Sequence, residues 1–475
     1  MKKIIMSLPA LMALAAPMGS FAQDNQDLIA KGEYLARAGD CTACHTAPGQ
    51  KPFAGGYAFS MPMGTIISSN ITPSKQFGIG DWTEQQFARA VREGVRPDGS
   101  VLYPAMPYTA YGNITDDDMK ALYAYFQSIP AVDAAPAQKT TLDFPFNLPG
   151  LMWVWKTLFA SSAAFTPNPT LTAEENRGKY LVEGLTHCST CHTPRNQFMA
   201  EDMTRYLSGA HVDGWLAPNI TADKNDGIGG WSNQELVSYL RNGHAEGKAQ
   251  AGGPMADAIE HSFRYLTQDD INAIVAYLRT VPPVGNQSDA QPSWGATQSK
   301  PVAWDSFETG GSKNNQPGYR DSTTTDGALL YSNNCAACHG INGEGSDDHY
   351  FPSLTHNTAV GAKDPSNLVM AIVDGIHRKG ADGEAVMPAF GEKDQMIHSW
   401  LSTAQIAAVT NYVTEHFGYG NAGLTASDVE AIERGTGDVP FMIRYAKAFF
   451  AAGVAVAAIV LIVIVVLVRR RKRQK

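Results

Sequence analysis

The sequence predicts a mainly α-helical protein with three tandem domains and one C-terminal helix that crosses a membrane. One six-residue pattern recurs at residues 41–46, 188–193 and 335–340, in two steps of 147 residues. The segments around each copy place apolar residues three and four apart, which is the period of an amphipathic helix. Residues 448–468 form an uninterrupted apolar run. With 475 residues the chain is too long for one ordinary core.

The chain begins with features of a secretory signal peptide at residues 1–22. Lys2 and Lys3 form a basic start, residues 4–16 are apolar, and Ser-Phe-Ala at residues 20–22 has the small-x-small pattern of a cleavage site. We expect cleavage after Ala22. An uncleaved N-terminal anchor is the alternative, but the apolar part is short for one.

The similarity between the copies extends well beyond the six-residue pattern, so each copy is a domain rather than a short repeat. Four pairs of segments match: KGEYLARAGDC (31–41) with RGKYLVEGLTHC (177–188), SSNITP (68–73) with APNITA (217–222), GIGDWTEQQFARAVREG (78–94) with GIGGWSNQELVSYLRNG (227–243), and TDDDMKALYAYFQSIP (115–130) with TQDDINAIVAYLRTVP (267–282). The third copy is shorter and keeps TDGALLYSNNC (325–335) and STAQIAAVTNYVTEHF (402–417). The expected domains are residues 23–135, 176–284 and 323–420.

Local signals define the last helix of the first two domains. Thr115 and Thr267 are expected N-caps, each followed by acidic residues that suit the positive end of a helix dipole. Pro130 and Pro282 lie just past the expected ends. Each domain is therefore expected to contain a first helix, the pattern, irregular loops, a further helix and a terminal helix.

Two linkers separate the domains. Residues 285–322 are rich in Gly, Ser, Gln, Asn and Pro and are expected to be ordered only by docking. Residues 136–175 include the aromatic stretch FPFNLPGLMWVWKTLF at 144–159. This stretch is either a contact for a partner or a quinone, or it packs against the first two domains; the sequence leaves both open.

The C-terminal part is expected to anchor the protein in a membrane. A juxtamembrane segment (421–447) precedes the apolar run at 448–468, which is long enough to span a bilayer, and the basic tail RRRKRQK follows at 469–475. Basic residues stay on the cytoplasmic side, so the domains are expected in the periplasm, attached to the inner membrane by a single pass. A buried core helix is the alternative, but such helices rarely end against five consecutive basic residues.

The charge of the exported part argues against a nucleic-acid partner. The whole chain carries −9, and without the two signal lysines and the six basic residues of the tail it carries −17. A strongly acidic body lacks the basic surface that binds phosphate backbones.

All six cysteines lie in the recurring pattern: CTACHT, CSTCHT and CAACHG. Disulfides suit an exported protein, but cysteines three residues apart in a helix pair poorly and the following histidine would have no role. A zinc half-site needs a second half-site nearby, and a thioredoxin-like redox motif does not explain the histidine.

Cys-x-x-Cys-His is instead the attachment signature of c-type haem. Two thiols form thioethers with the haem vinyl groups, and the imidazole ligates the iron. The expected attachment sites are Cys41, Cys44 and His45; Cys188, Cys191 and His192; and Cys335, Cys338 and His339.

A methionine is expected on the other side of each iron, where it raises the reduction potential and suits electron transfer. Met106, Met255 and Met387 each lie beside a proline between the loops and the terminal helix. Five other methionines are expected to fill cores: Met61, Met63, Met199, Met203 and Met370. No histidine outside the motifs recurs at an equivalent place in all three copies; these are His187, His211, His244, His261, His349, His356, His377, His398 and His416.

The three CxxCH domains, the repeated GxYL and GIGxW segments, NITP, LYPAMPY and the VMPAF loop together resemble one family. It is the triple-haem cytochrome c subunit of bacterial membrane-bound sugar, polyol and alcohol dehydrogenases, and the resemblance covers nearly the whole mature chain. PMADAIEHSFRYL at 254–266 and the membrane helix are most similar to the branch that serves FAD-dependent fructose, gluconate or sorbitol dehydrogenases. The fold that this implies is mainly α, with three tandem class I cytochrome c-type haem domains plus one C-terminal transmembrane helix.

The resemblance also implies partners and a role. The expected partners are a periplasmic flavoprotein dehydrogenase subunit, a small accessory subunit, membrane lipid and ubiquinone as electron acceptor. The chain itself is then a non-catalytic electron-transfer and anchoring subunit with three covalent haem c groups. Sequence proximity to the membrane helix makes the third domain a candidate for the quinone site, although the segment before that helix (421–440) leaves the geometry open.

Other functions remain as alternatives. The chain is the cytochrome subunit of a pyrroloquinoline quinone (PQQ)-dependent alcohol dehydrogenase, a free-standing membrane electron carrier, or a cytochrome module that serves a terminal oxidase. A haem peroxidase or nitrite reductase is an alternative of another class, but it needs an open sixth position on the iron. Three methionine-closed sites argue against it.

Overall fold

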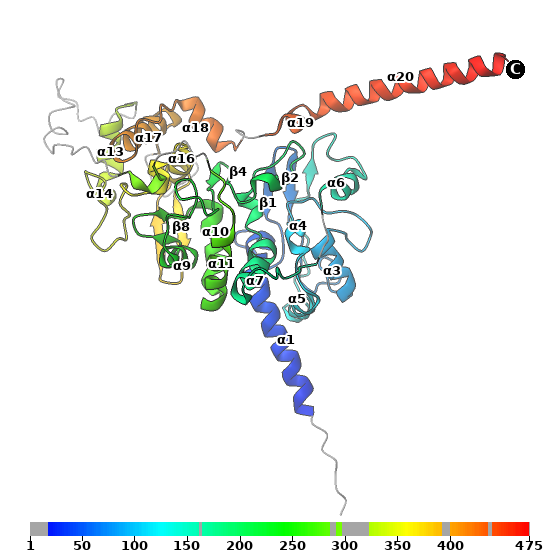
Figure 1. Cartoon of the computed structure of the whole chain (residues 1–475), viewed down its shortest axis with the longest axis horizontal. Coiled ribbons are helices and arrows are strands. Elements are labelled where there is room, and N and C mark those ends of the chain that lie inside the picture. Colours follow the sequence, from blue (N-terminus) through cyan, green and yellow to red (C-terminus); the bar gives the residue numbers. More distant parts are fainter. Residues whose placement is uncertain are drawn as a thin grey trace, which may run out of the picture.

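The computed structural model describes residues 18–160, 164–285, 291–296, 323–391, 400–435 and 439–474, and it confirms the mainly α fold (Figure 1). The first 17 residues of the expected signal peptide lie outside these ranges. Most of the expected linker at 285–322 and His398 also lie outside them.

The first domain combines five helices with one small sheet. Its elements are α1 (Met18–Ala38), α2 (Cys41–His45), β1 (Ala58–Met61), β2 (Gly64–Ile67), α3 (Glu84–Glu93), α4 (Tyr108–Tyr111), α5 (Asp116–Ser128) and β3 (Thr141–Leu142). The strands are antiparallel in the order β1-β2-β3, with Ala58 opposite Ile67 and Gly64 opposite Leu142. Because β3 belongs to the expected linker, the start of that linker is part of the first domain. Helix α6 (Leu151–Phe159) follows.

The second domain repeats this arrangement with more short elements. They are α7 (Ala173–Tyr180), the π-helical turn η1 (Leu181–Leu185), α8 (Ser189–His192), η2 (Met203–Arg205), β4 (Ala210–Val212), β5 (Trp215–Ala217), α9 (Asn233–Asn242), β6 (His244–Ala245), β7 (Ala249–Gln250), α10 (Gly253–His261), η3 (Phe263–Tyr265), α11 (Gln268–Thr280) and η4 (Ser293–Gly295). The strands form the antiparallel hairpins β4-β5 and β6-β7. The sequence pattern predicted irregular loops here, because two- and three-residue strands are too short to show alternation.

The third domain is the smallest, and the membrane helix follows it. Its elements are α13 (Gly327–Asn334), α14 (Ala336–His339), α15 (Thr358–Gly361), α16 (Ser366–Val373), β8 (Ile376–Lys379), β9 (Glu384–Met387), α17 (Thr403–Phe417) and α18 (Ala426–Glu433), followed by α19 (Phe441–Arg444) and α20 (Ala446–Arg473). Strands β8 and β9 form a third hairpin.

The first and last helices of every domain cross at a glycine. Helix α1 packs on α5, α7 on α11 and α13 on α17. A Cβ atom on Gly32 would lie 2.0 Å from the Ala121 carbonyl oxygen, and one on Gly178 would lie 1.8 Å from that of Ala273. At Gly327 the distance to the oxygen of Ala408 would be 2.5 Å. The helices therefore meet backbone to backbone at a point where only glycine fits.

Both predicted N-caps are confirmed. The Thr115 hydroxyl accepts a hydrogen bond from the Asp118 amide (3.3 Å), and the Thr267 hydroxyl accepts one from the Asp270 amide (3.2 Å). Each cap satisfies an amide that has no partner inside its own helix. The cap also fixes where the following acidic residues point, which matters for the contact between domains.

The first two domains share one hydrophobic core, whereas the third has its own. The shared core joins Leu35 and Phe126 to Leu181 and Ile274. The third domain buries Tyr331, Ile406 and Phe417 among other residues in a separate cluster. The first two domains therefore form one folding unit, to which the third is attached.

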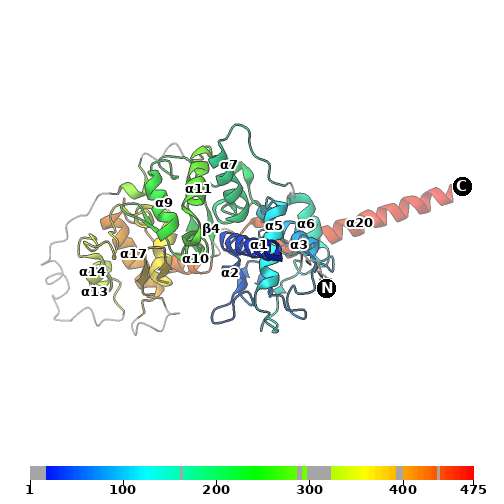
Figure 2. The same cartoon turned by 90° about the horizontal axis from the view of Figure 1, so that it is seen from below.

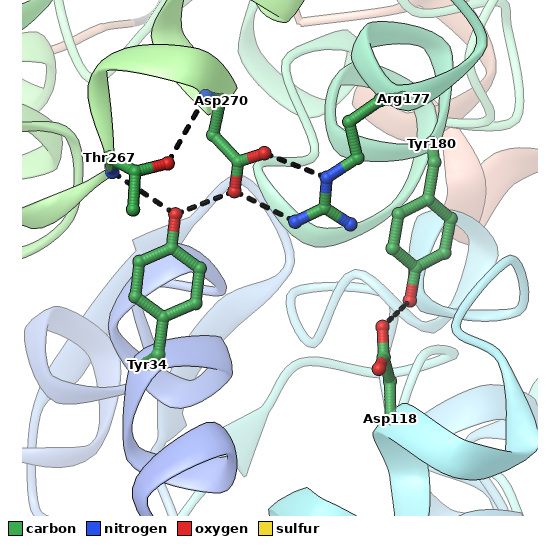
Figure 3. Close-up of polar contacts among 6 residues, drawn as sticks. All are labelled: Tyr34, Asp118, Arg177, Tyr180, Thr267 and Asp270. Atoms are coloured by element: carbon green, nitrogen blue, oxygen red, sulfur yellow. Dashed lines mark hydrogen bonds and ion pairs between the residues drawn. The ribbon is translucent and has the colours of Figure 1, made fainter. Parts of the chain in front are cut away.

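A reciprocal pair of tyrosine–carboxylate contacts joins the first two domains (Figure 3). Tyr34 of α1 donates to Asp270 of α11 (2.6 Å), and Tyr180 of α7 donates to Asp118 of α5 (2.6 Å). The two tyrosines occupy the same place in the repeat, as do the two aspartates. Each domain thus gives the other the same donor and acceptor, which is the pattern of an interface with approximate two-fold symmetry.

Basic residues complete this interdomain clasp, by which we mean Tyr34–Asp270 and Tyr180–Asp118. Arg177 binds both oxygens of Asp270 at 2.7 Å, and Lys31 lies 2.6 Å from Asp118. In the third domain the equivalent positions hold Leu329 and Gln405. The third copy therefore lacks both halves of the clasp, which explains why it does not join the pair in the same way.

The third domain docks on the second through polar contacts. His211 lies 2.9 Å from Asp364, and His244 lies 2.7 Å from Asp382. Arg378 of β8 is buried and donates to the Ala251 carbonyl (3.2 Å). Such an interface depends on the charge state of its carboxylates.

Acid is expected to loosen this docking. Burial raises the pKa of Asp364, but hydrogen bonds from His211 and Ser366 outweigh burial and lower the pKa to about 2. A free Asp has a pKa of about 3.9, so the stabilisation is complete above about pH 4 and is lost as the pH falls through about 2. Small-angle scattering between pH 5 and about 2 should show the chain expanding. Asp364→Asn should be expanded already at pH 5; an unchanged profile in that variant would contradict the prediction.

Helix α20 begins beside the first domain, although it follows the third in sequence. Phe450 of α20 contacts Phe144 edge to face at 4.7 Å, and Lys447 lies 4.0 Å from Asp143. Figures 1 and 2 both show α20 leaving the body on the side of α6 and α3, away from α13 and α17. Among the described residues, α20 alone is long and apolar enough to cross a membrane; its most apolar 18-residue window has a mean hydropathy of 3.3, with none of it buried.

Candidate haem-binding site

Each motif forms a short helical turn directly after the first helix of its domain. The turns are α2, α8 and α14, and each ends at its histidine: His45, His192 or His339. Cysteines three residues apart lie on the same side of such a turn. None of the six is in a disulfide.

Burial makes four of these thiols poor nucleophiles. It raises the pKa of Cys41, Cys44 and Cys335 to about 12 and that of Cys191 to about 11. Reactive redox cysteines have lowered pKa values instead. In the described part of the chain, no group of three or more His, Cys, Asp or Glu residues could hold a metal ion. The raised pKa values of these thiols do not fit a thioredoxin-like motif.

The three motif histidines are oriented in the same way. Nδ1 of His45 lies 2.7 Å from the Ser69 carbonyl oxygen, Nδ1 of His192 lies 2.7 Å from that of Pro218, and Nδ1 of His339 lies 2.9 Å from that of Pro352. A carbonyl oxygen can only accept a hydrogen bond, so Nδ1 carries the hydrogen and Nε2 keeps its lone pair. Burial lowers the pKa of all three imidazoles, which favours the neutral form that a metal requires.

The repeated Asn-Ile-Thr segments explain two of these carbonyls. Ser69 and Pro218 each precede the asparagine of such a segment. Oδ1 of Asn70 accepts from the amide and hydroxyl of Thr72, and its Nδ2 donates to the Val132 carbonyl (2.8 Å). The segment is thereby fixed to the chain that follows the terminal helix. Sequence reasoning recognised the repeat but did not assign this role. The available signal was its recurrence after the first two motifs, 29 residues after Cys41 and 31 residues after Cys188.

One continuous cavity of about 2900 Å³ connects the three motifs. His45, His192 and His339 all line it. The repeated GIGxW segments contribute apolar walls through Trp82 and Trp231. A single small-molecule site has roughly 300–1,000 Å³, so the volume fits about three ligands of that size rather than one.

The three predicted methionine ligands also line this cavity, but they sit on different local structures. Met106 lies in the loop before α4, Met255 in the first turn of α10, and Met387 at the end of β9. A proline flanks each of the three methionines, yet only Met106 lies in a loop. The similar sequence spacing of Met106 and Met255 therefore does not reflect an identical backbone.

The five methionines that were expected to fill cores divide into three groups. Met63 and Met370 are buried as expected of core residues. Met203 is 62% exposed, so the prediction that it fills a core is wrong; it lies on the short turn η2 at the surface. Met61 and Met199 reach the cavity instead of a separate core.

Most other described histidines have structural partners. Four lie within 3.4 Å of carboxylates: His211 with Asp364, His244 with Asp382, His349 with Glu246, and His377 with Glu384. His416 stacks on Tyr412 at 3.9 Å, and His187 packs edge-on against Tyr111 at 5.6 Å. These contacts agree with the expectation that histidines outside the motifs are mostly surface or structural residues.

The first two motifs are close neighbours. Gly39, just before the first motif, accepts a hydrogen bond from Tyr111 (2.6 Å), whose ring contacts His187, just before the second motif. Ser262 of the second domain donates to the Ala38 carbonyl (3.1 Å). The two attachment sites therefore meet at the interface between the domains.

These features define a class of protein. Three pairs of cysteines each precede an oriented imidazole, and the three imidazoles and three methionines line one apolar cavity. This is the architecture of a multihaem c-type electron carrier. The chain belongs to the cytochrome c family: the family model matches residues 29–130, 176–282 and 324–416.

Three relatives show where in this family the chain lies. It is 43% identical over 422 residues to the fructose dehydrogenase cytochrome subunit of Gluconobacter japonicus, covering 88% of this chain and 85% of the relative. It is 38% identical to the gluconate 2-dehydrogenase cytochrome c subunit of Pantoea cypripedii (90% and 95% covered). It is 36% identical to the cytochrome c subunit of the quinone-type alcohol dehydrogenase of Gluconacetobacter polyoxogenes (92% and 90% covered).

Proposed function

We propose that this chain is the electron-transfer and membrane-anchoring subunit of a dehydrogenase complex. The observation that carries the proposal is the continuous cavity that connects all three motifs. Haem groups held by the three motifs would share this cavity, so electrons could pass from one to the next without a mobile carrier. The relatives support the assignment, because each is a cytochrome subunit of a dehydrogenase.

We further propose which residues hold the three haem c groups. The cysteine pairs 41/44, 188/191 and 335/338 form the thioethers, and His45, His192 and His339 ligate the iron through Nε2. Met106, Met255 and Met387 are the ligands on the opposite side. Bound haem supplies one-electron redox chemistry at its iron.

The chain's own residues prepare each site for that chemistry. The carbonyls of Ser69, Pro218 and Pro352 keep the proton on Nδ1 of each histidine and fix the ring. Apolar walls such as Trp82 exclude water. Arg96 also lines the cavity, and burial lowers the pKa of its guanidinium even beside Asp98. A buried cation there fits the carboxylates that haem carries.

Loss of one methionine is expected to change one haem only. Met106→Ala, Met255→Ala and Met387→Ala should each remove about a third of the weak long-wavelength band that sulfur ligation gives to ferric haem. Each variant should also lower one of three reduction potentials. Met61→Ala is the matched control, because Met61 lines the same cavity without being a proposed ligand. A full band in any of the first three variants would exclude that residue as a ligand.

The proposed partners are a periplasmic flavoprotein dehydrogenase subunit that oxidises a sugar, polyol or sugar acid, and a small accessory subunit. Ubiquinone in the inner membrane is the proposed acceptor, with the haem domains in the periplasm and α20 as the single span. The names of the fructose and gluconate relatives favour a partner that oxidises a sugar or sugar acid, for which the sequence resemblance implies a flavoprotein. The relative named alcohol dehydrogenase (quinone) favours the second candidate, an alcohol dehydrogenase partner, for which the resemblance implies PQQ.

Electron delivery to quinone can be tested on this chain alone. The purified protein, embedded in lipid nanodiscs, is reduced chemically and mixed with ubiquinone while the haem absorbance is followed. Reoxidation of all three haems is expected. Haems that stay reduced with ubiquinone but are reoxidised by a soluble cytochrome would favour a free-standing carrier or an oxidase module.

Carbon monoxide distinguishes electron transfer from haem catalysis. A peroxidase or nitrite reductase needs an exchangeable position on the iron. The three methionines proposed here leave none, so the reduced protein should not change its spectrum under carbon monoxide. A rapid response from any of the haems would favour an enzyme instead.

A further inference from the structure

Helix α6 presents an apolar face to the outside of the protein. Trp153 is 42% exposed, Val154 59% and Leu158 68%. Positions i, i+1 and i+5 lie on one side of a helix. Large exposed apolar surfaces mark places where a soluble body meets a partner or a membrane.

The other face of α6 is fixed firmly to the body, so the exposed face is not the result of a loose helix. The Trp155 indole donates to the Phe198 carbonyl (2.8 Å), and its ring meets Tyr108 edge-on at 6.5 Å. Phe159 stacks on Phe198 at 5.5 Å. The sequence left open whether the aromatic stretch packs on the body or contacts a partner. In the structure, one side of α6 packs on the body and the other side is exposed.

The position of α6 relative to α20 indicates what covers the free side. Phe144, seven residues before α6, contacts Phe450, the third residue of the apolar run at 448–468. Asp143 lies beside Lys447, one residue before that run. Phe144 is thus at the depth where α20 enters the hydrocarbon. Figures 1 and 2 place α6 on the face of the body from which α20 departs.

We propose that residues 144–159 dock on the surface of the lipid bilayer, and that electrons leave for a lipid-soluble quinone from the first domain. Tryptophan and phenylalanine are the side chains that favour this layer of a membrane. This inference rests on the proposed function, because it requires α20 to span the membrane. It corrects the expectation, drawn from sequence proximity, that the third domain lies nearest the quinone.

The docking surface lies directly against the loop that carries Met106. The Tyr103 hydroxyl donates to the Phe146 carbonyl, and Tyr108, which Trp155 covers, is only 1% exposed. Met106 lies between these two tyrosines and lines the cavity. A quinone at the bilayer surface would therefore be separated from the first haem pocket by this one loop. Each quinone needs two electrons, delivered one at a time, and two protons from the surrounding water to become quinol.

A second occupant, the dehydrogenase subunit, is less consistent with this position. A protein partner over α6 would also cover Phe144 and the start of α20, where lipid is expected. The continuity between α6 and the membrane helix favours lipid. A test should therefore detect lipid itself rather than any covering molecule.

Lipid contact can be measured with a fluorophore on a single introduced cysteine. In the haem-loaded protein the native cysteines are held as thioethers, so Leu158→Cys provides the free thiol. The labelled full chain is placed in nanodiscs of phosphatidylcholine with or without brominated acyl chains, and the ratio of the two intensities cancels any quenching by haem. Tyr350→Cys, also exposed but in the third domain, is the matched control, and Val460→Cys in α20 is the positive control.

Bromine should quench the label at positions 158 and 460 and leave the label at 350 unchanged. A label at 158 that behaves like that at 350, while 460 is quenched, would overturn the docking surface and leave the membrane anchor intact. An unquenched label at 460 would overturn the anchor and this inference together.

The functional consequence is tested with charges on the free face. Val154→Glu combined with Leu158→Glu should slow quinone reduction roughly tenfold, equivalent to about 1.4 kcal/mol, while ferricyanide reduction and haem content stay unchanged. Tyr350→Glu is the control and should affect neither acceptor. Undiminished quinone reduction in the double variant would overturn the assignment of the electron exit to the first domain.

Discussion

Gly178→Ala is expected to prevent normal assembly of the second haem domain. The added methyl group would lie 1.8 Å from the Ala273 carbonyl oxygen and 2.7 Å from the Tyr277 side chain. Because the closest atoms belong to the backbone, the clash is relieved only if α7 and α11 move apart. Overpacked cores cost about 1–3 kcal/mol where side chains can adjust, and a backbone clash should exceed that. We expect little mature protein and a loss of haem at the second site.

The neighbouring Gly184→Ala provides a matched control. Its added methyl group would lie 3.3 Å from the Asn113 side chain, which needs only a small adjustment. Thermal unfolding and haem content should therefore be close to normal in this variant. A Gly178→Ala protein with three haems and unchanged unfolding would show that the helix crossing is looser than the structure indicates.

Loss of the interdomain clasp is the second large effect. Tyr34→Phe removes the hydroxyl that donates to Asp270, and Tyr180→Phe removes the one that donates to Asp118. Both aspartates are 7% exposed, so water replaces the lost donor poorly. Hydrogen bonds to charged groups contribute about 1.5–3 kcal/mol each. The double variant should therefore lower the unfolding free energy of the two-domain unit by about 3–6 kcal/mol if the two contacts are independent.

The symmetry of the clasp makes a more specific prediction. The two single variants should cost similar amounts, since each removes the same contact from equivalent positions. Tyr123→Phe is the control: its hydroxyl donates to the neutral Trp82 carbonyl within the first domain (2.8 Å), so its loss should cost less and leave the interface intact. Denaturant unfolding of the haem-loaded protein measures all four. A clasp in which only one tyrosine matters would contradict the two-fold arrangement.

Local features of the fold could be predicted because they depend on short-range chemistry. Thr115 and Thr267 are caps wherever a helix follows them, and the residues at 448–468 are too apolar to be anything but buried or in lipid. The thiols and histidines of the motifs were assigned to haem attachment from spacing alone, since that attachment requires nearby positions on one turn. The family comparison confirms the class of domain that these motifs define.

Features that depend on contacts between distant segments were not predictable from one sequence. Tyr34 and Asp270 are separated by 236 residues, and neither residue type indicates which distant residue it contacts. The backbone at Met106 and Met255 differs although their spacing follows the repeat. The return of the chain from the third domain to Phe144 likewise has no local signal, so sequence order alone does not reveal that α20 begins beside the first domain.

The most direct test of the account is purification of this chain through a tag in mild detergent, followed by addition of fructose, gluconate, sorbitol or ethanol while haem absorbance is recorded. We expect a dehydrogenase subunit with bound flavin to co-purify and one of these substrates to reduce all three haems. The chain without that subunit should not respond. A preparation with no dehydrogenase, in which the haems are reduced only by other cytochromes, would contradict the role of this protein as a dehydrogenase subunit.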